Sequence, residues 1–281
     1  MRIAITGTTG MLGQVLCQVL ARRHDLFPLP IDKLDITSLE DTRRLIWKAD
    51  PDWVIHVAAF TQVDQAELKP FEAYRVNALG TRNVAVAALE CDATVLYYST
   101  DYVFSGKTGE PYREWDQPDP INHYGRSKLA GEAFVRSLCP RHLIIRTSWL
   151  FGPGGVNFVG KVLERASAQK RIEVVDDQRG SPTLTHDLAE MTLRLLERES
   201  RGTYHVTNFG SCTWFQFARE IVSHRGIRVD VVPVSSAAFP SPAARPSQSA
   251  LDNYMLKCEG IPLLPPWQDA LARYLREEAP R

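Results

Sequence analysis

The residues best suited to chemistry in this chain are a tyrosine and a lysine four positions apart, Tyr124 and Lys128. They lie in a segment predicted to be helical, where residues four apart share a face, so both side chains can point into one cleft. An unperturbed phenol has a pKa of about 10, and a neighbouring cation lowers that pKa by stabilising the phenolate. Thr100, at the end of the preceding hydrophobic strand, can share the same substrate oxygen. The three residues could therefore move a proton to or from a sugar-type hydroxyl or carbonyl group.

Such a proton transfer needs a hydride partner, and the N-terminal segment predicts one. Residues 2–6 form a short β-branched run, followed by Gly7, Gly10 and Gly13 and then by a helical pattern. Strand, glycine turn and helix together are the setting of a dinucleotide-binding site, in which amides at the helix start hold the diphosphate. Gly7 permits the tight turn, Gly10 the approach of the diphosphate, and Gly13 the packing of helix on strand. The spacing is GxxGxxG instead of GxGxxG, so a purely structural turn is the alternative.

The end of the second predicted strand, residues 26–31, bears on the choice between NAD and NADP. An acidic residue there would bond the adenosine 2′-hydroxyl and favour NAD. This strand ends with Pro30 and Ile31, and the nearest acids, Asp32 and Asp35, lie further into the loop. Because no carboxylate is placed to repel a 2′-phosphate, the sequence favours NADPH, with NADH possible.

Composition limits the other classes of partner. The 281 residues include 33 basic and 33 acidic side chains, so no net charge favours nucleic acid or a membrane surface. Five cysteines are scattered without CxxC pairs, which argues against a disulfide framework or a zinc site and for a reducing cytoplasm. Met1 leads directly into a predicted strand, and no apolar run reaches the roughly 18–20 residues of a spanning helix. We expect a cytoplasmic protein that binds small molecules and no metal.

Strands alternate with helices through the first 150 residues, which predicts an α/β fold of the Rossmann type with a doubly wound parallel sheet. Residues 1–150 are expected to form the NAD(P)-binding domain. Residues 151–281 are expected to form a smaller substrate-binding domain, with some segments interleaved into the first. Ligands bind such sheets beyond the carboxyl ends of the strands, where the glycine turn, residues 59–61, residues 99–101 and Trp149 are all predicted to lie.

Four further residues have both a functional and a structural interpretation. Asp101 could contact substrate or cap the following turn. Trp149, at a strand end beside a Gly-rich loop, could cover a sugar or nucleotide or belong to the core. Asn157 and Arg245 could bind a nucleotide diphosphate, for which the bidentate donors of arginine are suited, or could be ordinary polar residues.

The chain resembles the extended short-chain dehydrogenase/reductases through TGTTGMLG at its start, STDYVF on the fourth predicted core strand and YGRSK on the helix. More narrowly, it is similar to the dTDP-4-dehydrorhamnose reductase family. The supporting segments, in family order up to about residue 252, are VAAFTQVDQAE, VNALGTRNVA, PYREWDQPDPINHYGRSKLAGE, RTSWLFGPGGVNFV, VVDDQRGSPT and RPSQSALD.

The resemblance implies NAD(P)H-dependent reduction of the 4-keto group of dTDP-6-deoxy-L-lyxo-4-hexulose to dTDP-L-rhamnose. It implies that Tyr124 donates the proton, that Lys128 lowers the pKa of Tyr124 and holds the nicotinamide ribose, and that Thr100 bonds the reacting oxygen. Asp101 and Trp149 match substrate-contacting positions. The positions that match cofactor-contacting ones are Gly10, Met11, Leu12, Asp35, Ile36, Ala59, Phe60 and Thr61, in addition to Tyr124 and Lys128.

Two other functions on the same scaffold stay open from the sequence. One is a nucleotide-sugar epimerase or dehydratase, which would keep and regenerate its cofactor. The other is a non-catalytic, cofactor-binding regulatory subunit similar to the β subunit of methionine adenosyltransferase. Some members of the resembled family use a metal at a dimer contact, but Val15 replaces the glutamate expected there, so no metal is predicted. We expect a nucleotide sugar as the substrate and either a monomer or a homodimer.

Overall fold

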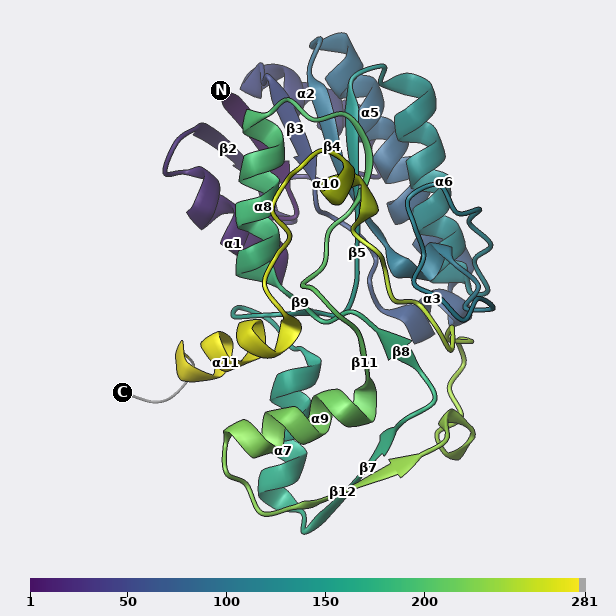
Figure 1. Cartoon of the computed structure of the whole chain (residues 1–281). Coiled ribbons are helices and arrows are strands. Elements are labelled where there is room, and N and C mark those ends of the chain that lie inside the picture. Colours follow the sequence, from purple (N-terminus) through teal and green to yellow (C-terminus); the bar gives the residue numbers. More distant parts are fainter. Residues whose placement is uncertain (278–281) are drawn as a thin grey trace.

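The computed structural model describes residues 1–277, and its centre is a parallel sheet of six strands (Figure 1). The strand order is β2-β1-β3-β4-β5-β10, and every neighbouring pair is parallel. The predicted Rossmann-type fold is confirmed. The strands are β1 (Arg2–Thr6), β2 (Asp25–Leu29), β3 (Trp53–His56), β4 (Thr94–Thr100), β5 (His142–Thr147) and β10 (Gly202–His205).

Helices cover both faces of the sheet because successive strand residues point to opposite sides. Ile3 and Ile5 pack in one apolar cluster with helices α1 and α8, whereas Ala4 packs in a second cluster with α2, α5 and α6. The middle residues of the strands buried on both faces are largely apolar, as expected of a parallel sheet, and polar residues such as Thr100 and Thr147 gather at the strand ends. The helices are α1 (Met11–Leu20), α2 (Leu39–Ala49), α5 (Thr81–Glu90), α6 (His123–Leu138) and α8 (Thr185–Glu197).

Segments from the second half of the chain belong both to the central sheet with its covering helices and to a second lobe. Strand β10 extends the central sheet next to β5, and α8 packs on the same face as α1. The remaining C-terminal elements surround a separate apolar cluster below the sheet in Figure 1. They include α7 (Phe158–Ala168), α9 (Trp214–His224), α11 (Trp267–Glu277) and the parallel pair β7 (Arg171–Val175) and β12 (Asp230–Val234). Positions 278–281 of the expected second domain lie outside the described residues.

Short elements connect the central sheet to the second lobe near the carboxyl ends of the central strands. β6 pairs with β9, and β8 pairs with β11. These four strands are β6 (Leu150–Phe151), β8 (Arg179–Gly180), β9 (Thr183–Leu184) and β11 (Cys212–Thr213), and the remaining helices are α3 (Val63–Leu68), α4 (Pro70–Tyr74) and α10 (Tyr254–Cys258).

The amphipathic pattern of residues 72–90 predicts one long helix, but a π-helical turn, Arg75–Gly80, interrupts it. The wider turn carries Asn77, whose side-chain oxygen accepts from Phe60 N (2.7 Å) and whose amide nitrogen donates to Phe60 O (3.0 Å). The apolar run of residues 52–60 predicts one strand, but β3 ends at His56, and the chain beyond it leaves the sheet and is held at Phe60 by Asn77. The two hydrogen bonds between Asn77 and Phe60 therefore hold the loop of residues 57–61, most of which lines the large cavity of the protein.

Candidate active site

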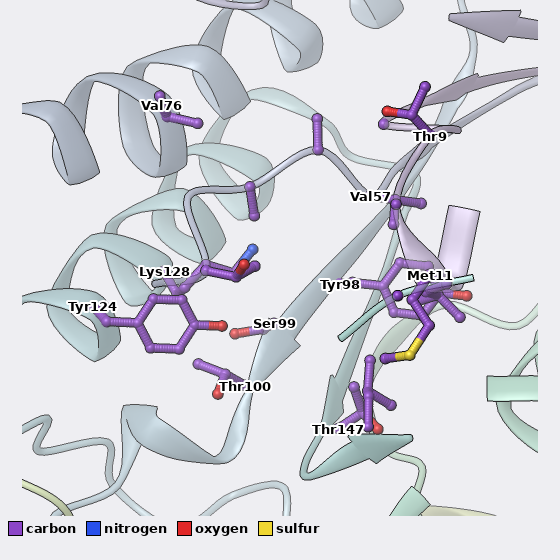
Figure 2. A pocket seen from close by; sticks show the side chains of 18 of the residues that line it. Thr9, Met11, Val57, Val76, Tyr98, Ser99, Thr100, Tyr124, Lys128 and Thr147 are labelled. Carbon is purple, nitrogen blue, oxygen red and sulfur yellow. The ribbon is translucent and has the colours of Figure 1, made fainter. Parts of the chain in front are cut away.

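A cavity of about 840 Å³ opens at the carboxyl ends of β1, β3, β4 and β5 (Figure 2). It is the place where ligands bind in doubly wound sheets. The predicted site residues that line it are Gly7, Gly10, Met11, Leu12, Asp35, Ile36, Ala59, Thr61, Thr100, Asp101, Tyr124, Lys128 and Trp149.

The glycine turn has the backbone geometry of an anion cradle. Gly7 adopts a φ of +71°, and a β-carbon there would lie 2.6 Å from Ala58 N. A β-carbon on Gly13 would lie 2.3 Å from Gly7 O, so Gly13 supports the packing of α1 on the turn and does not itself line the cavity. No side chain caps the start of α1 at Gly10. The first amides of the helix are thus left for a ligand, and the residues present fit a dinucleotide diphosphate.

The far end of the cavity is formed by the loop that follows β2. Leu34, Asp35 and Ile36 line it, and the Asp35 carboxylate accepts from Thr37 N (2.9 Å) and Thr37 Oγ1 (2.7 Å). These hydrogen bonds lower the pKa of Asp35, so the carboxylate is ionised at neutral pH. Lys128 is the one lysine or arginine among the described residues that line the cavity.

Tyr124, Thr100 and Lys128 converge at the middle of the cavity, as the sequence predicts. In Figure 2 the Tyr124 hydroxyl points toward Ser99 and Thr100 at the end of β4, with Lys128 beside the ring. Asn122 begins α6 by accepting from Gly125 N (2.8 Å), which places Tyr124 and Lys128 in the first two turns of the helix. The Lys128 ammonium lies 4.1 Å from the centre of the Tyr97 ring.

Burial is the largest cause of the pKa shifts of Tyr124 and Lys128. It raises the pKa of Tyr124 to about 12, although hydrogen bonding with Thr100 opposes the shift. It lowers the pKa of Lys128 to about 7, although the charge of Glu132 opposes that shift. The sequence predicts a lowered tyrosine pKa, but desolvation by burial is the larger effect in the structure. Tyr124 is consequently protonated at neutral pH, which is the state a proton donor requires.

A buried ion pair lies behind α6 and was not predicted from the sequence. Glu132, fully buried, receives two hydrogen bonds from Arg146, at 2.9 and 2.8 Å, and a third from Arg136 at 2.8 Å. Its position four residues after Lys128, in YGRSKLAGE, was the available signal. The pair joins α6 to β5, one turn along α6 from Lys128.

Asn77 also turns out to support the site. Its side-chain nitrogen donates to Ser127 Oγ (2.9 Å), and Ser127 Oγ donates to Tyr124 O (2.8 Å). A continuous set of hydrogen bonds therefore joins the loop at Phe60 to the helix that carries Tyr124. Phe60 itself does not line the cavity, and its backbone is what Asn77 holds.

Two stacked indoles form part of the cavity wall. Trp149 has a φ of +47° and stacks on Trp214, with ring centres 3.3 Å apart and planes 5° from parallel. A β-carbon on Gly180 would lie 2.3 Å from the Trp149 ring, so glycine is required for this placement. Trp214 starts α9 after the capping box of Thr213 and Gln216, and nothing in the sequence alone singled it out.

Two predicted substrate residues lie outside the cavity wall. Asn157 caps α7 by accepting from Gly160 N (3.2 Å) and donates to Gly152 O (2.9 Å), so it organises the Gly-rich loop. The geometry gives its expected diphosphate contact no support. Arg245 pairs with Asp64 at 2.8 Å and bonds the Tyr102 side chain, which does line the cavity.

Within residues 1–277, no group of three or more His, Cys, Asp or Glu side chains is arranged to hold a metal ion. None of the helices in the described part of the chain has the length and apolar character needed to cross a bilayer.

Comparison with known proteins agrees with this geometry. The family model described as "RmlD substrate binding domain" matches residues 1–279. The spore coat polysaccharide biosynthesis protein SpsK of Bacillus subtilis (strain 168) is 37% identical over 279 residues, covering 99% of this chain and 98% of its own. The dTDP-4-dehydrorhamnose reductase of Salmonella typhimurium (strain LT2) is 35% identical over 292 residues, covering 99% of this chain and 98% of its own.

Among solved structures, the crystal structure of dTDP-4-dehydrorhamnose reductase from Bacillus anthracis in complex with NADP is similar, with a TM-score of 0.96 and 44% identity. The match covers 98% of this chain and 99% of that one. Since the fold, the motifs and the whole length agree, the chain belongs to the RmlD family, that of the dTDP-4-dehydrorhamnose reductases.

Proposed function

We propose that this protein is an NADPH-dependent dTDP-4-dehydrorhamnose reductase, which reduces the 4-keto group of dTDP-6-deoxy-L-lyxo-4-hexulose to give dTDP-L-rhamnose. The observation that carries the proposal is one continuous cavity that begins at the glycine turn and ends at the stacked indoles, with Tyr124 and Lys128 between them. A cofactor at one end and a sugar nucleotide at the other would meet beside the phenol.

The reduced nicotinamide, when bound, supplies a hydride to the carbonyl carbon. Tyr124 donates its proton to the carbonyl oxygen as negative charge develops there. The Thr100 hydroxyl, next to the phenol, orients the same oxygen by hydrogen bonding. Burial of Thr100 and Lys128 strengthens these interactions because electrostatic attraction is less screened there.

Lys128 has two proposed tasks. Its ammonium is a hydrogen-bond donor to the hydroxyls of the nicotinamide ribose, and its charge stabilises the phenolate left after proton transfer. Glu132, one turn further along α6, favours the charged form of Lys128 against the cost of burial. The cofactor contacts of Gly7, Gly10, Met11, Leu12, Asp35, Ile36, Ala59 and Thr61 are inferred from their position in the cavity wall.

The substrate contacts are inferred for residues at the other end. Asp101 and Trp149 line the cavity, and Arg245 lies behind Tyr102, where its guanidinium could meet a diphosphate only by leaving Asp64. We assign the lobe around α7, α9 and α11, within residues 151–277, to substrate binding because it supplies Trp214 and holds Trp149. The five cysteines are all free thiols, on which we base a cytoplasmic location. We expect either a monomer or a homodimer, and light scattering would distinguish the two.

The test is NADPH oxidation with the 4-keto sugar nucleotide as substrate, followed by identification of the product. Stoichiometric oxidation with formation of dTDP-L-rhamnose is expected. An epimerase would convert the sugar without net NADPH consumption. A regulatory subunit would bind NADPH without turnover, and either result would contradict the proposal.

A further inference from the structure

We propose that the Gly-rich loop of residues 152–156 covers the diphosphate of bound NADPH and that Gln14 holds the loop in this place. The inference rests on the proposed reductase function, which puts the cofactor against the glycine turn, and it adds a second wall to the cofactor site. Gln14 acts through the loop, so it is a positioning residue that touches no reacting atom.

The loop leads into α7 of the second lobe but packs on the glycine turn of the first. Gln14, in the first turn of α1, donates from Nε2 to Thr9 O (2.8 Å) and, over a longer distance, to Gly154 O (3.4 Å). One side chain thus joins the glycine turn to a loop 140 residues later in the chain. The fit is close, since a β-carbon on Gly154 would lie 2.6 Å from Gln14 Oε1. A β-carbon on Gly155 would lie 3.0 Å from Met11 Cβ.

The end of the loop next to α7 is fixed as well. Asn157 donates from Nδ2 to Gly152 O (2.9 Å) and to Gly155 O (3.3 Å). The same nitrogen lies 3.9 Å from Met11 Sδ, in the first turn of α1. Gly154 has a φ of +82°, a conformation that favours glycine and lets the backbone turn between Gln14 and Asn157. The loop is therefore held at both ends against α1.

The loop and the glycine turn line the same cavity. Gly154, Gly155 and Val156 belong to its wall, together with Thr9 and Met11. In Figure 2, Thr9 and Met11 lie across the cavity from Tyr124, on the side where the proposed function places the cofactor diphosphate. Val156 is 85% exposed although it lines the cavity, so a bound ligand would cover its apolar side chain.

The backbone of the loop has hydrogen-bond donors to offer to an anion. Within residues 1–277, the N–H groups of Gly154, Gly155 and Val156 donate to no protein group. Apart from Lys128, no lysine or arginine of the described chain lines the cavity, so a diphosphate depends largely on backbone donors. Successive N–H groups in a turn form concave anion sites, and they bond anionic oxygens more strongly than neutral ones. The loop can thus bond the side of the diphosphate that faces away from α1.

The first test measures NADPH binding to Gln14→Ala by cofactor fluorescence, with Gln18→Ala as the matched control. Gln18 lies one turn further along α1, is also exposed, and its side chain forms no hydrogen bond within the described residues. Loss of the hydrogen bonds of Gln14 should raise the Kd of NADPH by about 3–10-fold. The kcat at saturating NADPH and the melting temperature should match those of Gln18→Ala. Equal Kd values for the two variants would overturn the inference.

A second ligand locates the effect at the diphosphate. 2′-Phospho-ADP-ribose keeps the diphosphate of NADPH but lacks the nicotinamide, so Gln14→Ala should weaken the binding of both ligands by the same factor. If the variant binds only NADPH more weakly, the loop acts on the nicotinamide and the assignment to the diphosphate is refuted.

Gly155→Ala tests the loop itself, because the new β-carbon would crowd Met11 and displace the loop from α1. We expect a raised Kd of NADPH, whereas Gly109→Ala, whose β-carbon would meet nothing within 4 Å, should leave the Kd unchanged. In the wild-type enzyme, NADPH should slow hydrogen exchange of the amides of residues 154–156, and exchange that NADPH does not change would overturn the inference. If the wild-type enzyme binds no NADPH at all, the reductase proposal itself is wrong.

Discussion

The buried carboxylate of Glu132 allows a prediction whose size follows from the structure. Burial alone would raise its pKa, but the hydrogen bonds and charge of Arg146, with help from Arg136, lower the pKa from 4.5 to about 2. One pKa unit corresponds to about 1.4 kcal/mol, so the ionised carboxylate contributes about 3 kcal/mol to the free energy of unfolding at neutral pH. Glu132→Gln keeps the shape but removes the charge and leaves Arg146 buried and unpaired, which typically costs about 3–5 kcal/mol.

The assay is urea denaturation at neutral pH, with Glu90→Gln as the matched control. Glu90 forms a similar two-bond pair with Arg43, but its side chain is 30% exposed, so its loss should cost less than about 1 kcal/mol. A Glu132→Gln enzyme that loses no more stability than the control would refute the assignment of a strong buried pair.

The contribution of Glu132 to the free energy of unfolding should fall as the pH is lowered. Because the pKa of Glu132 is lower in the folded state than in the unfolded state, its contribution is complete above pH 4.5 and is lost as the pH falls toward 2. The stability gap between wild type and Glu132→Gln should therefore narrow across that range. A gap that stays constant would show that the charge is not its origin.

Three further substitutions address other parts of the site. Lys128→Met should abolish most activity and NADPH affinity. It should also raise the melting temperature, because burial lowers the pKa of Lys128 to about 7, which means that the buried ammonium destabilises the folded state at neutral pH. A lower melting temperature would contradict this. Gly180→Ala should raise KM for the sugar nucleotide and leave the Kd of NADPH unchanged, since its β-carbon would displace Trp149; an unchanged KM would count against the indole wall. Gly7→Ala should cost about 1–3 kcal/mol of stability and weaken NADPH binding, because φ is +71° and Ala58 N is 2.6 Å away; calorimetry that finds neither loss would refute the cradle.

Much of the fold and of the candidate site could be predicted because it depends on local patterns. The glycine turn and the i, i+4 placement of Tyr124 and Lys128 follow from glycine spacing and helical periodicity. The π-helical turn at Asn77 could not be predicted, because its cause is a pair of hydrogen bonds to Phe60, 17 residues earlier.

The difference between local patterns and long-range contacts also explains which residues the sequence did not predict. Trp214 and Arg146 reach the site only through the packing of distant segments, which no local pattern records. The raised tyrosine pKa was missed for a related reason, since the sequence shows that Lys128 is close but not how strongly the phenol is desolvated. Asn157 stays a predicted diphosphate contact without support from the geometry, because its side chain already binds the backbone of its own loop.

The most direct measurement is the rate at which Tyr124→Phe enzyme, saturated with NADPH, reduces the 4-keto sugar nucleotide. The phenol oxygen is the group that should protonate the ketone, so kcat should fall by about 10²–10⁴-fold while the Kd of NADPH and the melting temperature change little. A mutant that turns over at the wild-type rate would contradict the account at its centre.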